Sequence, residues 1–245
     1  MSNRLLNYMN RRLGNQNELA SPRIQGPVIT ISREVGCGGV EIARLLSEEL
    51  NRRQLFTSDP WQVISKEVLN RSATELKLNP ERVHRIFSGG TLVFDEILAS
   101  LTTKYYKNSR MIIRSVRRVI RNLALEGNSI IVGRAGNVIA ADLENSLHLR
   151  FTAPLEWRIQ SISDTQNMSR AESMEYIRET DRKKEYYRQY FMDSKHPDDT
   201  FDLSVDVSRF SREQVIELII SAFEIKGIPL RMKQFARQSN SVSIP

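Results

Sequence analysis

The chain has 245 residues, a formal net charge of +7 and a pI near 9.7. Its hydrophobic content of 40% and charged content of 27% are globular values, which exclude a disordered chain. No apolar run approaches the length of a membrane span and no signal-peptide pattern opens the sequence, so we expect a cytoplasmic protein with no membrane partner. The basic charge favours anionic partners, and by itself it does not separate nucleotides from nucleic acids.

Cysteine and histidine give little sign of metal or disulfide chemistry. The single Cys37 cannot form an internal disulfide, which suits a reducing compartment. The three histidines, His84, His148 and His196, show no metal-ligand spacing with one another or with Cys37, so no zinc site is expected.

The pattern divides the chain into three parts. Residues 1–26 read as a basic N-terminal extension in which Gly14 and Pro22 interrupt any long helix. Residues 27–227 read as one folded domain, and residues 228–245 as a flexible tail rich in Arg, Gln, Asn and Ser.

The domain opens with a strand, a glycine-rich loop and a helix. Val28, Ile29 and Ile31 predict a short buried strand, and an amphipathic helix is predicted from about Val40. The glycines at 36, 38 and 39 let the backbone between them approach a ligand closely. A loop of this kind before a helix N-terminus is typical of an anion cradle, most often for phosphate.

This loop departs from both standard phosphate-binding patterns. Gly39 and Val40 stand where a P-loop carries its Lys and its Ser or Thr, and Glu41 replaces the third glycine of a dinucleotide fingerprint. A tight turn between strand and helix, with no ligand, is the alternative interpretation.

Further along, the stretch 61–69 reads as an amphipathic segment, and residues 71–126 are helical in pattern. The last of these helices carries a cationic stripe from Arg114 to Arg121, made of Arg114, Arg117, Arg118 and Arg121. Such a stripe is either a surface for nucleic-acid phosphates or a solvated helix face.

The second half of the chain supplies more strands with arginines near their ends. The strand 129–132 is followed by Arg134, which is placed to hold a phosphate bidentately because ligands bind beyond the carboxyl ends of parallel strands. A strand at 147–153 precedes a helix, and Ser169 with Glu172 forms a capping box for the next one.

In that next helix Arg178 and Arg182 are four residues apart, so they share a face and could converge on one polyphosphate. A last strand is predicted at 202–208, and a final amphipathic helix follows Ser211. Strands alternating with helices indicate a three-layer α/β domain.

Three segments resemble the cytidylate kinase-like family of P-loop nucleoside monophosphate kinases. They are I-T-I-S-R-E-V-G-C-G-G-V-E-I at 29–42, I-I-V-G-R-A-G at 130–136 and A-P-L-E-W-R-I at 153–159, and Asp181-Arg182 is similar to the family's lid. The resemblance covers about residues 27–227. It implies an α/β three-layer P-loop kinase fold with a parallel five-stranded sheet, a helical acceptor-binding insert and a helical lid.

The resemblance also implies a function, namely ATP-dependent phosphorylation of a nucleoside monophosphate with Mg²⁺, with CMP or dCMP favoured. The implied nucleotide-binding residues are Arg33, Gly36, Cys37, Gly38, Gly39, Val40 and Glu41. The implied acceptor-binding residues are Ser65, Lys66 and Arg134, and the catalytic ones are Arg134, Arg158, Arg178 and Arg182. No Mg²⁺ ligand can be named from the sequence.

Two consequences follow for the loop. Because its lysine is missing, another cation must neutralise the phosphates, and Arg134, Arg158 and Arg182 are the candidates. The thiol of Cys37 is expected at a helix N-terminus, where positive potential favours the thiolate.

Two other functions stay open. One is a nucleotide-binding protein with little turnover, because the loop lacks its lysine and hydroxyl. The other is a nucleic-acid-binding module that uses the Arg114–Arg121 stripe, which the absence of any zinc-finger or RNA-recognition signature does not favour.

Overall fold

The computed structural model describes residues 26–55, 59–65, 117–189, 191–192 and 200–228. Lys66, most of the predicted helical insert and nearly all of the two predicted terminal segments lie outside the described residues. Within the described part, no helix is long and apolar enough to cross a bilayer.

A five-stranded sheet forms the centre of the domain, with strand order β2-β3-β1-β4-β5. Its strands are β1 (Val28–Arg33), β2 (Gln62–Ile64), β3 (Ser129–Val132), β4 (Ser146–Thr152) and β5 (Leu203–Asp206). All pairings are parallel, which confirms the predicted sheet. The apolar start of β1 reflects its central place, because a strand with neighbours on both edges and helices on both faces has no solvated side.

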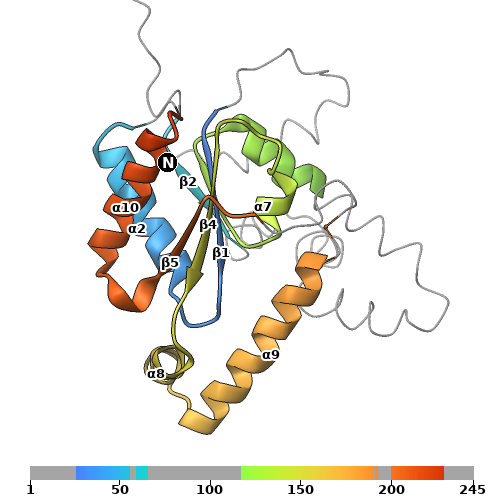
Figure 1. Cartoon of the computed structure of the whole chain (residues 1–245), viewed down its shortest axis with the longest axis vertical. Helices are drawn as coiled ribbons and strands as arrows, with labels where there is room; N and C mark the ends of the chain where they lie inside the picture. Colours follow the sequence, from blue (N-terminus) through green and yellow to red (C-terminus); the bar gives the residue numbers. More distant parts are fainter. Residues whose placement is uncertain (1–25, 56–58, 66–116, 190, 193–199, 229–245) are drawn as a thin grey trace, which may run out of the picture.

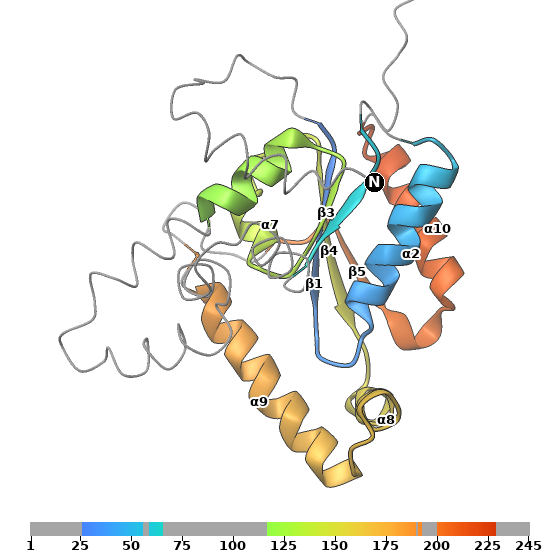
Figure 2. The same cartoon turned by 180° about the vertical axis from the view of Figure 1, so that it is seen from behind.

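Helices cover both faces of the sheet and make a three-layer domain (Figures 1 and 2). On one face lie α2 (Gly39–Arg52) and α10 (Arg212–Ile225), where the rings of Trp61 and Phe223 pack edge to face with centroids 5.9 Å apart. On the other face lie α7 (Gly136–Ile139) and the helical residues 117–126. The three-layer prediction is confirmed.

Two helices, α8 (Leu155–Gln166) and α9 (Arg170–Gln189), lie beyond the carboxyl ends of the strands (Figure 1). The predicted capping box is present, because the amide of Ser169 donates to Glu172 and the amide of Glu172 donates to the Ser169 hydroxyl. An apolar cluster of Val35, Ile159, Ile162 and Ile177 joins both helices to the loop after β1. These helices therefore rest on the glycine-rich loop.

The predicted last strand is longer than the observed one. The chain leaves the sheet after Asp206 and makes a 3₁₀ turn at Val207–Arg209, because the Asp206 carboxylate accepts from the amide of Ser208 and caps the turn. The strand predicted at 129–132 is β3 itself.

Candidate active site

Residues 34–38 form the phosphate loop between β1 and α2. Gly38 is the N-cap of α2 with φ 63°, and no side chain caps this helix. The amides of the first helical turn are therefore left to bind a ligand, at the positive end of the helix dipole. Gly36 has φ 91°, and a Cβ there would lie 2.9 Å from the carbonyl oxygen of Arg158, so only glycine lets α8 approach the loop this closely.

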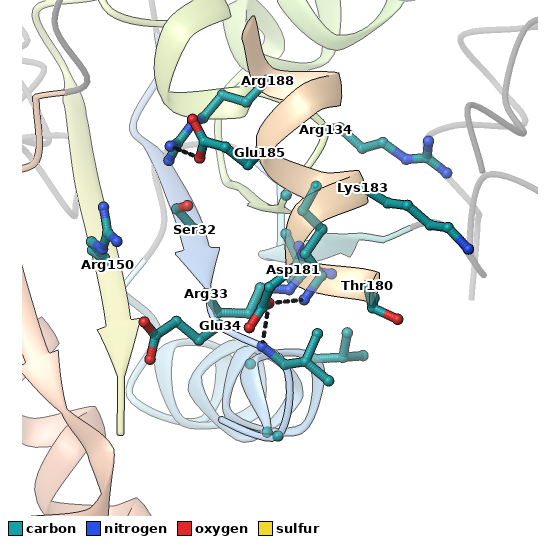
Figure 3. A pocket seen from close by; sticks show the side chains of 18 of the residues that line it. Ser32, Arg33, Glu34, Arg134, Arg150, Thr180, Asp181, Lys183, Glu185 and Arg188 are labelled. Carbon is teal, nitrogen blue, oxygen red and sulfur yellow. Dashed lines mark hydrogen bonds and ion pairs between the residues drawn. The ribbon is translucent and has the colours of Figure 1, made fainter. Parts of the chain in front are cut away.

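A cleft of about 1180 Å³ opens between this loop, the strand ends and α9 (Figure 3). Cationic side chains outnumber acidic ones along its walls. The cations are Arg33, Arg44, Arg134, Arg150, Arg182, Lys183, Lys184 and Arg188, and the acids are Glu34, Glu41, Asp181 and Glu185. The positive charge and the free helix N-terminus suit a polyanion.

Arg33 is the last residue of β1, and its side chain lines the cleft. A Cβ built on Gly39 would lie 3.0 Å from Cγ of Arg33, and one built on Gly133 would clash with its Nη1. The Arg33 stem therefore runs along the start of α2, and its guanidinium reaches the end of β3.

The turn after β3 holds Arg134 in a strained conformation. Gly133, Arg134 and Ala135 all have positive φ, at 73°, 57° and 52°. Left-handed backbone at a side-chain-bearing residue is unfavourable and is often found at functional sites. Arg134 lines the cleft, and in Figure 3 it extends away from Arg33 and Asp181.

Asp181 of α9 is bonded to the phosphate loop and to α8. Its Oδ1 accepts from the amide of Val35 at 2.9 Å, and its Oδ2 accepts from Nη1 of Arg158 at 2.7 Å. Arg158 also donates to the carbonyl of Ala153 at 3.1 Å and lies 3.5 Å from Glu34. Arg158 thus joins three segments and does not line the cleft, so the structure places this predicted catalytic residue in a supporting position.

Lys184 is a cleft residue that was not selected from the sequence. It follows Asp181 by one helical turn, with Nζ 3.6 Å from Oδ1 of that aspartate. Burial lowers the pKa of Lys184 to about 8, and the positive charge of Arg33 acts in the same direction, while Asp181 opposes both. Asp181, Lys184 and Arg188 share one face of α9 by their spacing, but the spacing alone does not say which face meets the cleft.

The prediction of a thiolate at Cys37 is wrong. This side chain is 1% exposed and packs in the core beneath α2, and its amide donates to the carbonyl of Glu34 at 3.4 Å. Burial, and after it the charge of Glu34, raises the pKa of Cys37 to about 12. The helix N-terminus does not overcome this desolvation.

Not all of the predicted site residues line the cleft. Arg182 lines the cleft, whereas Arg178 is exposed and does not, so the expected convergence of the two is not found. Ser65 is buried directly after β2 and does not line the cleft either. The predicted loop residues at 36 and 38–41 do line it.

Two arginines of the Arg114–Arg121 stripe contact the protein itself. Arg117 donates to the carbonyl of Phe191 at 2.5 Å and lies over its ring, and Arg121 makes a two-pronged pair with Asp142 at 2.6 and 2.7 Å. Arg118 is exposed, and Arg114 lies outside the described residues. The stripe is therefore partly used to hold the fold together.

Magnesium would have to be held largely by phosphates and water. Among the described residues, no group of three or more His, Cys, Asp or Glu side chains could hold a metal ion. Mg²⁺ in phosphate-transfer sites usually keeps several waters and takes only one or two carboxylates, so the acids of this cleft fit an ion delivered with ATP.

Solved structures with a similar fold were found by comparison of coordinates. A protein of unassigned function from Eubacterium ventriosum has a TM-score of 0.57 at 18% identity over 82% of this chain and 99% of that one. A gluconokinase from Sinorhizobium meliloti has a TM-score of 0.43 at 8% identity over 83% and 94% of the two chains. The first likeness shows a shared fold and nothing about activity.

Comparison of sequences gives two further matches. A uronate isomerase from Corynebacterium glutamicum is 24% identical over 127 residues, which are 51% of this chain and only 24% of the isomerase. The model of the cytidylate kinase-like family matches residues 28–209, which include the phosphate loop, the Arg134 turn and α9. The chain therefore belongs to the cytidylate kinase-like family, which supports a nucleotide kinase as its general class of function.

Proposed function

We propose that this protein transfers the γ-phosphoryl group of ATP to a nucleoside monophosphate, with CMP or dCMP as the favoured acceptor. The observation that carries the proposal is the convergence of an uncapped helix N-terminus and a set of cations in one cleft. Phosphoryl transfer depends on positioning and charge neutralisation more than on covalent chemistry, and this cleft offers both. The choice of CMP or dCMP rests on the family alone.

In this proposal the residues around the cleft bind different parts of the two substrates. The amides at the start of α2 bind the phosphates of ATP, and Mg²⁺ bound to ATP neutralises part of their charge. Arg134 holds the acceptor phosphate through its two parallel N–H donors. Arg182 and Lys184 bring positive charge from α9, which together with α8 excludes water from the reacting groups.

A nucleotide-binding protein with little turnover is the second candidate. It is favoured by one specific observation, since Gly39 and Val40 supply neither the lysine nor the hydroxyl of a complete P-loop. The two candidates share the binding site and differ in whether product forms.

The test offers MgATP with CMP, dCMP, UMP, AMP or GMP to the full chain and separates the products by anion-exchange chromatography. We expect CDP or dCDP to form fastest. Nucleotide binding without any product at high enzyme concentration would establish the second candidate, and absence of nucleotide binding would refute both.

A pair of variants locates the site. Arg134→Ala should lower kcat/KM for the acceptor about a hundredfold, because it removes a donor that stabilises transferring charge. Arg52→Ala removes the same charge at the far end of α2, where the side chain is 71% exposed, and should change the rate less than about threefold. Equal effects of the two variants would place the acceptor site elsewhere.

A further inference from the structure

The incomplete P-loop leaves one chemical requirement open. A P-loop lysine reaches the β- and γ-phosphates and neutralises them, and position 39 of this chain is a glycine. If the proposed kinase reaction occurs, a cation from another position must take over that role.

The side chain of Arg33 fills the space that a lysine at position 39 would need. Any Cβ at Gly39 would meet Cγ of Arg33 at 3.0 Å and its Cβ and Cδ at 3.4 Å. The glycine at 39 and the arginine at 33 are therefore sterically linked, because the stem of one side chain passes where the other would begin.

The guanidinium of Arg33 lies at the turn after β3. It reaches Gly133, where a Cβ would clash with Nη1 and would lie 3.1 Å from Cζ. Gly133 is followed directly by Arg134, which we assign to the acceptor phosphate. The Arg33 side chain therefore extends from the start of α2, where we assign the ATP phosphates, to the turn that carries Arg134.

A second cation approaches the same point from α9. Lys184 lines the cleft, and Asp181, one turn earlier, is fixed to the amide of Val35 in the phosphate loop. Arg33 and Lys184 line the same cleft, and the positive charge of Arg33 acts with burial to lower the pKa of Lys184. Two neighbouring cations that repel each other are stabilised by an anion between them.

We propose that Arg33 acts as the phosphate-binding cation of this loop in place of a lysine at position 39, and that Lys184 supplies a second charge from α9. This inference rests on the proposed function. It replaces the earlier candidates Arg134, Arg158 and Arg182 for that role, because Arg158 does not line the cleft and the Arg33 stem is the one that covers Gly39.

The steric link between positions 33 and 39 gives a rescue experiment. Titration calorimetry measures the affinities of the full chain for MgATP and for adenosine, which has no phosphates. Arg33→Ala should weaken MgATP binding about tenfold or more and leave adenosine binding unchanged. Adding Gly39→Lys to Arg33→Ala should return the MgATP affinity to within about threefold of wild type, whereas adding Gly39→Ala should not.

Lys184 is tested with a matched change on the same helix. Lys184→Met should weaken MgATP binding about threefold to tenfold. Arg170→Met removes one charge near the start of α9, where the side chain is 69% exposed and paired with Glu156, and should leave the affinity unchanged. Thermal unfolding of every variant is recorded, and Arg33→Gln replaces Arg33→Ala if the alanine variant does not fold.

Each outcome bears on one proposal. A wild-type chain that does not bind MgATP refutes the proposed function itself. A wild-type chain that binds MgATP while Arg33→Ala binds equally well refutes only the inference about Arg33. A loss in Arg33→Ala that Gly39→Lys cannot restore refutes the claim that Arg33 stands in for a lysine at position 39.

Discussion

The contact between Asp181 and the phosphate loop allows a stability prediction with a built-in comparison. Asp181→Ala removes the acceptor of the Val35 amide at 2.9 Å and of Nη1 of Arg158 at 2.7 Å. Hydrogen bonds to a charged group contribute about 1.5–3 kcal/mol each. Because the Asp181 side chain is 28% exposed and Arg158 keeps Glu34 at 3.5 Å, we take the lower end of that range for both bonds. The expected loss in the free energy of unfolding is about 3 kcal/mol.

Asp142→Ala is the matched control. Asp142 makes an equally short, two-pronged pair with Arg121, but the two side chains are 52% and 36% exposed. Solvent screening and side-chain entropy reduce such a pair to about 0–1 kcal/mol. Asp181→Asn should fall between the two, because its amide oxygen still accepts from the Val35 amide.

The assay is equilibrium unfolding in urea, followed by circular dichroism, with the slope against urea required to be unchanged. If Asp181→Ala and Asp142→Ala lower the free energy of unfolding by the same amount within about 0.5 kcal/mol, then burial does not strengthen the Asp181 contacts and the argument fails.

Three further predictions concern titration and reactivity. Burial lowers the pKa of His148 to about 4, so as pH falls the unfolded chain binds a proton before the folded chain does, and the free energy of unfolding falls between about pH 6.5 and 4. In urea unfolding, the free energy of unfolding of His148→Gln should fall by about 2 kcal/mol less than that of wild type between pH 7 and 5. Because Lys184 loses its charge above its pKa of about 8, the affinity for MgATP should fall as pH rises above 8, and Lys184→Arg should remove this fall. An identical dependence of the affinity on pH in wild type and Lys184→Arg would exclude Lys184 from the site. Cys37 is 1% exposed and its pKa is raised to about 12, so it should react with iodoacetamide in urea and hardly at all in the folded protein, with or without ATP. Rapid labelling of the folded chain would contradict this, because it would show that the thiol is accessible.

The sheet and its helices could be predicted from the sequence because local signals and buried position agree there. The run Val28–Ile31 is β-branched and, apart from Thr30, apolar, and it lies at the centre of the sheet. Ser169 with Glu172 marks a helix start within one turn, and the structure has that cap. The end of β5 was missed, since a side-chain cap by Asp206 competes with the strand and leaves no change in hydrophobic period.

The candidate site was only partly predictable, because its charges are arranged by tertiary packing. The sequence identified Arg134 and Arg182, which line the cleft, from motif position. It gave no reason to choose Arg158 as a junction or Lys184 as a cleft residue, since spacing along α9 does not say which face meets the loop. Burial of Cys37 was also hidden, because a cysteine between glycines looks exposed in sequence.

The two cations that we propose to bind phosphate, Arg33 and Lys184, come from elements that differ in how they are held. Arg33 belongs to the central strand, so its stem is fixed to the sheet, whatever the position of α9. Lys184 belongs to α9, and the Asp181 contact with the amide of Val35 helps to hold that helix on the loop. Any movement of α9 that breaks the Asp181 contact would also withdraw Lys184 from the phosphate loop. In a complete P-loop the lysine is part of the loop, so its charge is present before a lid closes. Here the charge of Arg33 is fixed to the sheet, whereas that of Lys184 depends on where α9 rests, and Asp181 is one of the contacts that hold α9 on the loop.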